Sequence, residues 1–215
     1  VVFSLFFGKL AKIPSNGLPY PIFYYSALLP WTYFANSIQN ATNTIVAHQN
    51  MVKKVYFPRL ILPLSAVLSG LVDFAIAFSV LLGMMLFYEI MPTWKLLLLP
   101  VLLALATLTA LGVGLWLSAL NALYRDVRYA TPFLIQLWLF ASPVAYPASM
   151  VPERWQWLYW LNPMTGVIEG FRWALTGQGQ QLNNLFFVSL CIVGLTLVLG
   201  LMFFHRMEGT IADVV

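Results

Sequence analysis

The segment Asn50-Met51-Val52-Lys53-Lys54-Val55-Tyr56-Phe57-Pro58-Arg59 separates two long apolar runs and decides how the chain is organised. Its three cations cannot enter hydrocarbon without a large free-energy cost, so the segment is expected at a membrane face. Its aromatic and aliphatic side chains could equally bind another protein. The segment therefore predicts a membrane protein, and it serves either as an anchoring loop or as a docking site for a soluble partner.

The composition supports the membrane assignment. Charged residues make up 8% of the 215 residues and hydrophobic residues 61%, whereas a soluble domain carries about 25% charged residues. The net charge of +4 comes from basic residues scattered between apolar runs, which suits loops near anionic headgroups and does not indicate nucleic-acid binding. One cysteine, Cys191, excludes an internal disulfide and a cysteine-based metal cluster.

Five apolar runs are predicted to form membrane-spanning helices, since a span needs about 20 apolar residues. Residues 1–8 are interpreted as the end of a further span, in a chain truncated at its N-terminus. The expected fold class is an all-α integral membrane protein with six spans, the first truncated, in a single transmembrane domain over residues 1–215. The five complete runs cover residues 20–46, 60–88, 96–120, 131–147 and 182–204.

Residues 149–177 are predicted to form two short helices that dip in from one membrane face. Pro152 and Pro163 each suit the first turn of a helix, Asn162 is a good N-cap, and Gly177 suits a helix end. The second helix, about 20 Å long, is too short to cross a bilayer. Four aromatic residues of the first favour the headgroup layer: Trp155, Trp157, Tyr159 and Trp160.

Three of the long runs carry features that restrict what they can face. The second half of residues 20–46 is polar, which predicts contact with protein or water rather than lipid. Asp73 is either functional, the default for a charge within a span, or a buried partner of Asn or Ser on a neighbouring helix. Small residues at every fourth position of residues 96–120 predict close approach of another helix: Ala106, Ala110, Gly114 and Ser118.

Basic residues do not decide the orientation, because the two predicted membrane faces carry similar numbers. One face would hold six cations: Lys53, Lys54, Arg59, Arg125, Arg128 and Arg206. The other would hold five: Lys9, Lys12, Lys95, Arg154 and Arg172. The sequence also lacks a P-loop, an H-E-x-x-H motif and a G-x-S-x-G motif, and its seven acidic residues are scattered. No catalytic site is therefore expected.

Several stretches, in order, resemble the permease subunit of polysaccharide-exporting ATP-binding-cassette transporters. These are type-2 exporters of O-antigen, capsule and teichoic-acid (polyol phosphate) polymers. The resemblance covers essentially the whole chain. The matching stretches are Leu29-Pro30-Trp31-Thr32-Tyr33-Phe34, Lys54-Val55-Tyr56-Phe57-Pro58-Arg59, Tyr124-Arg125-Asp126-Val127-Arg128, Phe140-Ala141-Ser142-Pro143-Val144, and Leu161-Asn162-Pro163 with Gly170-Phe171-Arg172.

The resemblance implies a multi-pass subunit of the cell inner membrane that exports a lipid-linked polysaccharide, such as lipopolysaccharide O-antigen or capsule. It implies two permease copies per transporter and two separate ATPase subunits that bind ATP and magnesium, so no cofactor or metal is expected on this chain. It places residues 47–59 in the cytoplasm as a coupling segment and residues 149–177 on the outer side. Alternatives are a type-2 exporter of drugs or lipids and a membrane-embedded lipid-sugar enzyme.

Three sets of candidate site residues follow from the patterns and the resemblance together. The ATPase-coupling set is Lys53, Lys54, Val55, Tyr56, Phe57, Pro58 and Arg59. The candidate channel lining is Tyr24, Tyr25, Trp31, Tyr33, Phe34, Asn36, Gln39, Asn40 and Asn43, with helix packing as the alternative for the aromatic members. The outer gate or interface set is Trp155, Trp157, Tyr159, Trp160, Asn162, Pro163, Glu169 and Arg172. In this last set the aromatic residues contact either sugar or lipid, and Glu169 and Arg172 are spaced to pair on one helix.

Overall fold

The computed structural model describes residues 18–54, 57–90, 94–177 and 184–214. The partial span predicted for residues 1–8, and the coupling candidates Val55 and Tyr56, lie outside the described residues. The described elements are all helical. In chain order they are α1 (Tyr20–Ala47), α2 (Gln49–Lys54), α3 (Ile61–Phe87), η2 (Trp94–Leu98), α4 (Leu99–Leu123), α5 (Val127–Phe140), η3 (Ala148–Met150), α6 (Glu153–Tyr159), α7 (Pro163–Thr176) and α8 (Asn184–Val214).

The described chain is all-α, and several of its helices have the length and apolar composition of membrane-spanning helices. Three stretches of the described residues are long and apolar enough to cross a membrane: Ile61–Phe87, Trp94–Leu123 and Phe186–Thr210. Helix α1 has 28 residues, about 42 Å, but its second half is polar. Helix α5 has 14 residues, about 21 Å, shorter than a hydrocarbon core of about 30 Å. The number of spans stays a prediction.

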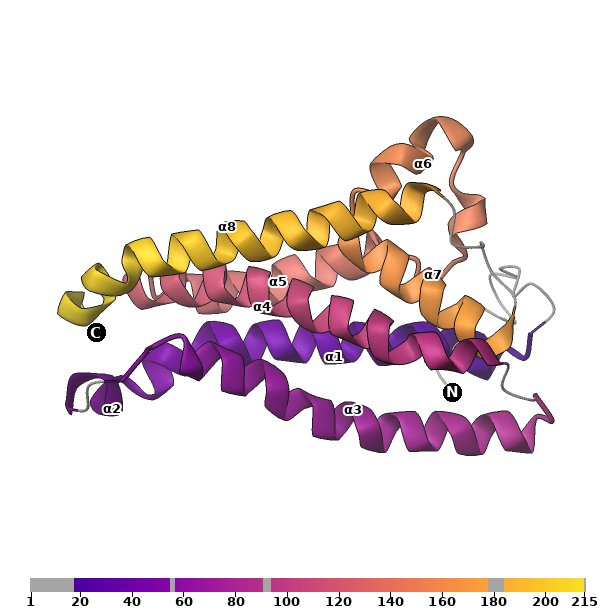
Figure 1. Ribbon diagram of the computed structural model, residues 1–215, viewed down its shortest axis with the longest axis horizontal. Helices are drawn as coiled ribbons and strands as arrows, with labels where there is room; N and C mark the ends of the chain where they lie inside the picture. Colours follow the sequence, from indigo (N-terminus) through magenta and orange to yellow (C-terminus); the bar gives the residue numbers. More distant parts are fainter. Residues whose placement is uncertain (1–17, 55–56, 91–93, 178–183, 215) are drawn as a thin grey trace.

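The long helices run side by side along the longest axis of the molecule (Figure 1). At one end lie α2, the last turns of α8 and the connection between α4 and α5; at the other lie η2, α6 and α7. We call these the α2 end and the α6 end. Helix α1 is central, because it contacts α3, α4, α5 and α7.

The small-residue stripe of α4 is buried, and its Gly114 packs closely against α1. All four are buried, and a Cβ placed on Gly114 would lie 2.8 Å from the Cβ of Ala41 on α1. The buried side chain of Asn121 adds a hydrogen bond, donating from Nδ2 to the Thr42 carbonyl at 2.9 Å. Close backbone approach of the kind that holds helices together in lipid therefore joins α4 to α1.

A second close crossing joins α4 to α8. A Cβ on Gly200 would lie 2.3 Å from the Gly112 carbonyl oxygen, and a Cβ on Gly112 would lie 2.8 Å from the Thr196 backbone. Neither position tolerates a side chain without moving a helix. This pair of glycines was not singled out from the sequence, because the two residues are 88 positions apart and follow no shared spacing.

Helix α7 has the ends that the sequence predicts. Asn162 caps it by accepting a hydrogen bond from the Met164 backbone N–H, and Gly177 ends it with φ 70°. The structure adds that all of α7 except Trp173 and Thr176 is buried within the bundle, whereas its position relative to the headgroup layer stays a prediction. Its small residues explain this burial: Gly166 lies against Ser189 of α8 and Gly170 against Leu102 of α4.

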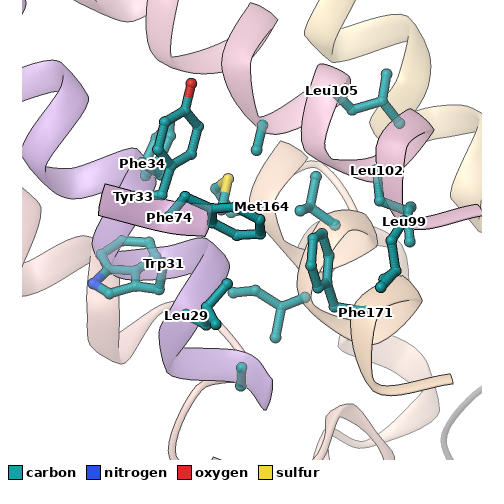
Figure 2. Close-up of a cluster of buried hydrophobic side chains, with 14 of the residues drawn as sticks. Leu29, Trp31, Tyr33, Phe34, Phe74, Leu99, Leu102, Leu105, Met164 and Phe171 are labelled. Atoms are coloured by element: carbon teal, nitrogen blue, oxygen red, sulfur yellow. The ribbon is translucent and has the colours of Figure 1, made fainter. Parts of the chain in front are cut away.

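The main core forms where α7 meets α1, α3 and α4. Figure 2 shows side chains from all four helices meeting in this cluster. They include Leu29, Trp31, Tyr33 and Phe34 of α1, Phe74 of α3, Leu99, Leu102 and Leu105 of α4, and Met164 and Phe171 of α7. The core thus fixes α7 relative to the long helices.

Helix α5 ends earlier than the range 131–147, and it begins earlier, at Val127. The chain turns after Phe140, where the Ser142 hydroxyl donates to the Trp138 carbonyl at 2.9 Å. Pro143 and Pro147 follow and cannot donate a helical N–H. Residues 141–147 therefore form a loop that leads to α6.

Candidate functional site

Helix α2 presents most of its side chains to the outside. Val52 is buried and holds the helix against the bundle, whereas Met51, Lys53 and Lys54 are exposed. Of the described residues that follow, Phe57 is half-buried, Pro58 is exposed and Arg59 is half-buried. A soluble partner could therefore reach the two lysines and Met51 directly. Met51, which is 41% exposed, was not among the sequence-based candidates.

Arg59 ties this segment to the far end of the chain. Its Nη1 donates to the backbone carbonyl of Glu208 on α8. A small apolar cluster at the same end joins Ile45 of α1, Leu115 of α4 and Phe204 of α8. The α2 end is thus one packed unit in which α8 touches Arg59 of the predicted coupling segment. No sequence pattern links Arg59 to a residue 149 positions away.

Eight of the described cations lie at the two ends as the alternation of runs predicts, whereas Lys9 and Lys12 lie outside the described residues. The α2 end carries six cations on α2, in the two neighbouring turns, in the first turn of α5 and on the last part of α8: Lys53, Lys54, Arg59, Arg125, Arg128 and Arg206. Lys95 and Arg154 lie at the α6 end, on η2 and α6. Arg172 lies on α7 but is buried. Each end therefore offers cations to a membrane face.

One stripe of α1 is polar and faces outward; we call it the polar face. Thr32, Asn36, Gln39 and Asn40 are exposed, and Asn43 is half-buried. Their spacing of three and four residues places them on one side of the helix. Lipid would leave such amides without hydrogen-bond partners, so the polar face requires water, another protein segment or a polar ligand.

The aromatic members of the predicted channel lining point the other way. Tyr24, Trp31, Tyr33 and Phe34 are buried. The Tyr33 hydroxyl lies 2.9 Å from Thr107 Oγ1 of α4, and the Phe34 ring meets Trp138 of α5 edge to face at 5.1 Å. Within a single chain these rings pack helices together.

Tyr25 lies between these two groups. It is half-buried, and its hydroxyl donates to the Ala77 carbonyl of α3 at 3.2 Å. Of the predicted lining, the structure therefore brings the amides together on the polar face and turns four of the five aromatic rings into the core.

At the α6 end, Glu169 and Arg172 form a buried ion pair. Their side chains are each 2% exposed, and Arg172 Nη1 lies 3.1 Å from Glu169 Oε1. Burial lowers the pKa of Arg172 from its ordinary value, and the Glu169 carboxylate opposes that shift. The Phe23 ring of α1 lies 3.9 Å from the guanidinium carbon. The pairing at i, i+3 matches the spacing in the sequence.

Both members of the pair also hold the loop that follows α5. Arg172 Nη2 donates to the Val144 carbonyl at 2.9 Å, and Glu169 Oε1 accepts the Ala148 backbone N–H at 3.1 Å. We call this arrangement the loop clamp. It joins α7, α1 and residues 144–148, and it satisfies backbone groups that would otherwise be buried without partners.

Asn162 joins the same loop to the start of α7. Its Oδ1 accepts from Trp138 Nε1 at 2.9 Å as well as from the α7 backbone. Its Nδ2 donates to the Ala141 carbonyl at 3.2 Å and to Ser142 Oγ at 2.8 Å. The sequence predicted the cap; the bonds to α5 depend on the fold. Pro163 follows, buried at the first position of α7.

The four aromatic residues of the first short helix have different surroundings. Trp155 and Trp157 are exposed, Tyr159 is half-buried and Trp160 is buried. The Trp160 carbonyl accepts a hydrogen bond from Ser189 Oγ of α8 at 2.9 Å. A largely apolar pocket of about 370 Å³ lies beside Trp155 and Tyr159. The exposed pair suits lipid headgroups or sugar, and Trp160 supports α8.

A cation–π contact at the α6 end was not predicted from the sequence. The Lys95 Nζ of η2 lies 4.1 Å from the centre of the Trp173 ring on α7. This cation–π contact fixes the start of α4 against α7.

Asp73 is exposed on α3, and neither ion pair of the described residues includes it.

The amino-acid sequence of the chain is similar to those of known transport proteins. Residues 1–176 match the family model described as ABC-2 type transporter. The O-antigen export system permease protein RfbA of Myxococcus xanthus is 30% identical over 71% of this chain and 60% of its own length. The chain therefore spans about three fifths of that relative.

Two other relatives align over more of both chains. The O-antigen export system permease protein RfbA of Klebsiella pneumoniae is 27% identical over 91% of this chain and 75% of its own length. The polysialic acid transport protein KpsM of Escherichia coli is 23% identical over 94% of this chain and 79% of its own length. Each of these names describes movement of a polysaccharide.

Proposed function

Because this chain belongs to the ABC-2 type transporter family, we propose that it is the transmembrane subunit of an ATP-driven exporter of lipid-linked polysaccharide. The relatives are O-antigen permeases and a polysialic acid transporter, and both cargoes are long hydroxyl-rich polymers. In this proposal the chain crosses the inner membrane several times and carries the polymer outward.

The polar face of α1 is the observation that carries the proposal. It exposes amides and a hydroxyl along a helix that lies among long apolar helices. A hydrated polymer needs such groups along its path, whereas a purely apolar cargo does not. Two copies of the chain would enclose a passage when their polar faces meet, so we propose a homodimer as the working unit.

The energy source lies in a separate subunit. The sequence has no P-loop, so ATP and magnesium are proposed to bind a partner ATPase. The exposed residues Met51, Lys53 and Lys54 of α2 would meet that partner on the cytoplasmic side. The loop clamp and α6 would then lie on the outer side, near the exit.

Deleting the gene in its native cells separates the candidate functions. An exporter defect leaves the polymer synthesised but trapped inside the cell, and it removes the polymer from the surface. A lipid-sugar enzyme defect removes the polymer altogether. For a drug or lipid exporter, the surface polymer is unchanged. Carbohydrate staining of fractionated cells measures all three.

Purification of the full-length permease from the same cells tests the partnership. We expect an ATP-binding-cassette ATPase to co-purify, and a variant of that ATPase unable to hydrolyse ATP should reproduce the trapped polymer. If surface polymer persists in the deletion strain, the proposed function is wrong.

A further inference from the structure

A small cavity with both polar and apolar lining lies between α1 and α3, at the polar face. Its volume is about 160 Å³. Thr32 and Asn36 line it from α1, and Asp73 lines it from α3. The rings of Tyr33 and Phe74, 5.8 Å apart, close its inner side, and Figure 2 shows the same two rings next to each other in the core. The cavity therefore combines hydrogen-bonding groups with an aromatic wall.

Gly70 makes room for this cavity. It lies one turn before Asp73 on α3, and a Cβ there would be 3.1 Å from Ser37 Oγ and 3.2 Å from the Tyr33 ring. The two helices approach closely at this point and leave the space beyond it, toward Asp73 and Ala77, unfilled. The cavity follows from the way α1 and α3 cross.

Asp73 gives the cavity its chemistry. It lies near the middle of α3, a helix long and apolar enough to cross a membrane, and it is exposed. Neither ion pair of the described residues includes it. A carboxylate at such a depth requires water, hydrogen-bond donors or a cation. Thr32 cannot satisfy it, because its hydroxyl donates to the Leu28 carbonyl at 2.8 Å.

The other side chains of α3 around Asp73 are apolar, so the polar lining of the cavity is confined to one side of this helix. Val72 and Ile76 are 64% and 63% exposed, as suits a surface toward lipid. Ala75 and Phe78 line a separate apolar pocket toward α4. Asp73 lies on the side of α3 that adjoins the polar face of α1, so a polar occupant would reach the cavity from that face.

We propose that this cavity is a sugar-binding subsite in the path of the exported polymer. Sugar hydroxyls would donate to the Asp73 carboxylate and exchange hydrogen bonds with the Asn36 amide, while a C–H face of the sugar packs on Phe74 and Tyr33. This inference rests on the proposed function. It names Asp73, Asn36 and the groove between α1 and α3 as a place where the polymer is held.

The size of the cavity suits a cargo that must move on. The cavity volume of about 160 Å³ is several times the roughly 30 Å³ that one water molecule takes in the liquid, so the cavity accepts only a small part of a polymer at a time. A site on a transport path must bind well enough to admit its cargo and weakly enough to release it. A cavity that binds only part of the polymer can both admit the cargo and release it.

Photo-crosslinking tests the subsite with Asp73 left in place. A photoreactive residue is introduced at Ala77, which lines the cavity, in the full-length permease of its native cells. The matched control is Ala75 on the same helix, which lines the apolar pocket. We expect Ala77 to give high-mass adducts that stain as carbohydrate and disappear after periodate cleavage of vicinal diols, and Ala75 to give none.

Asp73→Leu should reduce the Ala77 adduct about tenfold, as loss of a charged hydrogen-bond partner predicts, and Asp73→Asn should reduce it less.

A third position separates this inference from the proposed function. Asn40 lies on the polar face but outside the cavity. If Asn40 gives carbohydrate adducts and Ala77 gives none, the subsite is wrong and the exporter stands. If Ala77 reacts with a second copy of the chain, with its own N-terminal part or with lipid alone, the groove is closed to sugar and the subsite is again overturned. If neither position meets carbohydrate in cells that export polymer, both proposals fail.

Discussion

At the scale of single residues, the loop clamp concentrates charge in the interior. Arg172 and Glu169 give up solvation, and their bonds to the loop carbonyls and N–H offset that cost. A buried pair contributes little net stability over an apolar pair, but loss of one partner leaves a buried charge unpaired. The clamp therefore makes the position of the loop depend on both residues together.

Arg172→Met tests this dependence. We expect it to lower the free energy of unfolding by about 3–5 kcal/mol, because Glu169 remains buried without its cation. Arg154→Met is the matched control, since Arg154 is exposed on α6, and its effect should stay within about 0.5 kcal/mol. Unfolding of the purified protein by sodium dodecyl sulfate, followed by circular dichroism, measures both.

The double variant Glu169→Gln with Arg172→Met should recover most of that loss. Glutamine keeps an oxygen for the Ala148 N–H and carries no charge, so the double variant should lie within about 2 kcal/mol of the original protein. A double variant as unstable as Arg172→Met alone would show that the unpaired carboxylate is not the cause.

At the scale of helices, the glycine contacts decide which pairs approach closely. Gly114→Leu should separate α4 from α1, because even a Cβ at this position would lie 2.8 Å from Ala41. Overpacking of this kind costs about 1–3 kcal/mol, and the amount of assembled protein in the membrane should fall. Gly194→Leu on α8 is the control, since nothing lies within 4 Å of that position. Quantitative immunoblotting of membranes compares them, and equal amounts would mean that the α4–α1 contact does not limit assembly.

A second prediction compares an aromatic and a basic side chain of the predicted coupling segment, residues 47–59. Phe57→Ala should weaken export and ATPase binding more than Lys53→Ala, because a central aromatic residue at an interface contributes about 2 kcal/mol or more, and a rim charge contributes little. Met51→Ala adds a probe that is 41% exposed, so its effect reports docking rather than folding. Membrane insertion should be unchanged in all three.

The anchoring-loop alternative predicts the reverse order for the same variants. In that case the lysine variants disturb topology, and Phe57→Ala exports normally with its ATPase still bound. Polymer export, insertion and ATPase co-purification, measured side by side, distinguish the two.

At the scale of the whole molecule, the proposed function fixes the orientation, because it places the α2 end on the side of the ATPase. In a Cys191→Ser background, Arg154→Cys should react with a membrane-impermeant maleimide on intact spheroplasts, and Arg125→Cys only after the membrane is opened. Both positions are exposed in the structure. The opposite pattern would place α2 outside and remove the coupling assignment.

The sequence predicted much of this architecture because membranes impose strong local rules. Helix content, the Asn162 cap, the Gly177 end and the small-residue stripe of α4 each depend on a few neighbouring residues. The loop clamp depends on partners 21 and 28 positions away, and the burial of α7 and the Gly112–Gly200 crossing depend on partners as far as 68 and 88 positions away. Spacing along one chain carries no record of such pairs. The aromatic rings of α1 belong to this second group, because their neighbours on α4 and α5 decide where they point.

Helix α8 is attached at both ends and held near its middle. It meets Arg59 through the Glu208 carbonyl, crosses α4 at Gly200 and bonds to the Trp160 carbonyl through Ser189. The contacts lie about 12 Å and about 16 Å from the crossing along the helix. A stiff rod of these proportions is a lever with a fulcrum at Gly200. In the proposed exporter, a sideways displacement of Arg59 would reappear at the Ser189 end of α8 reversed in direction and slightly enlarged, with no hinge needed between the two ends of the bundle.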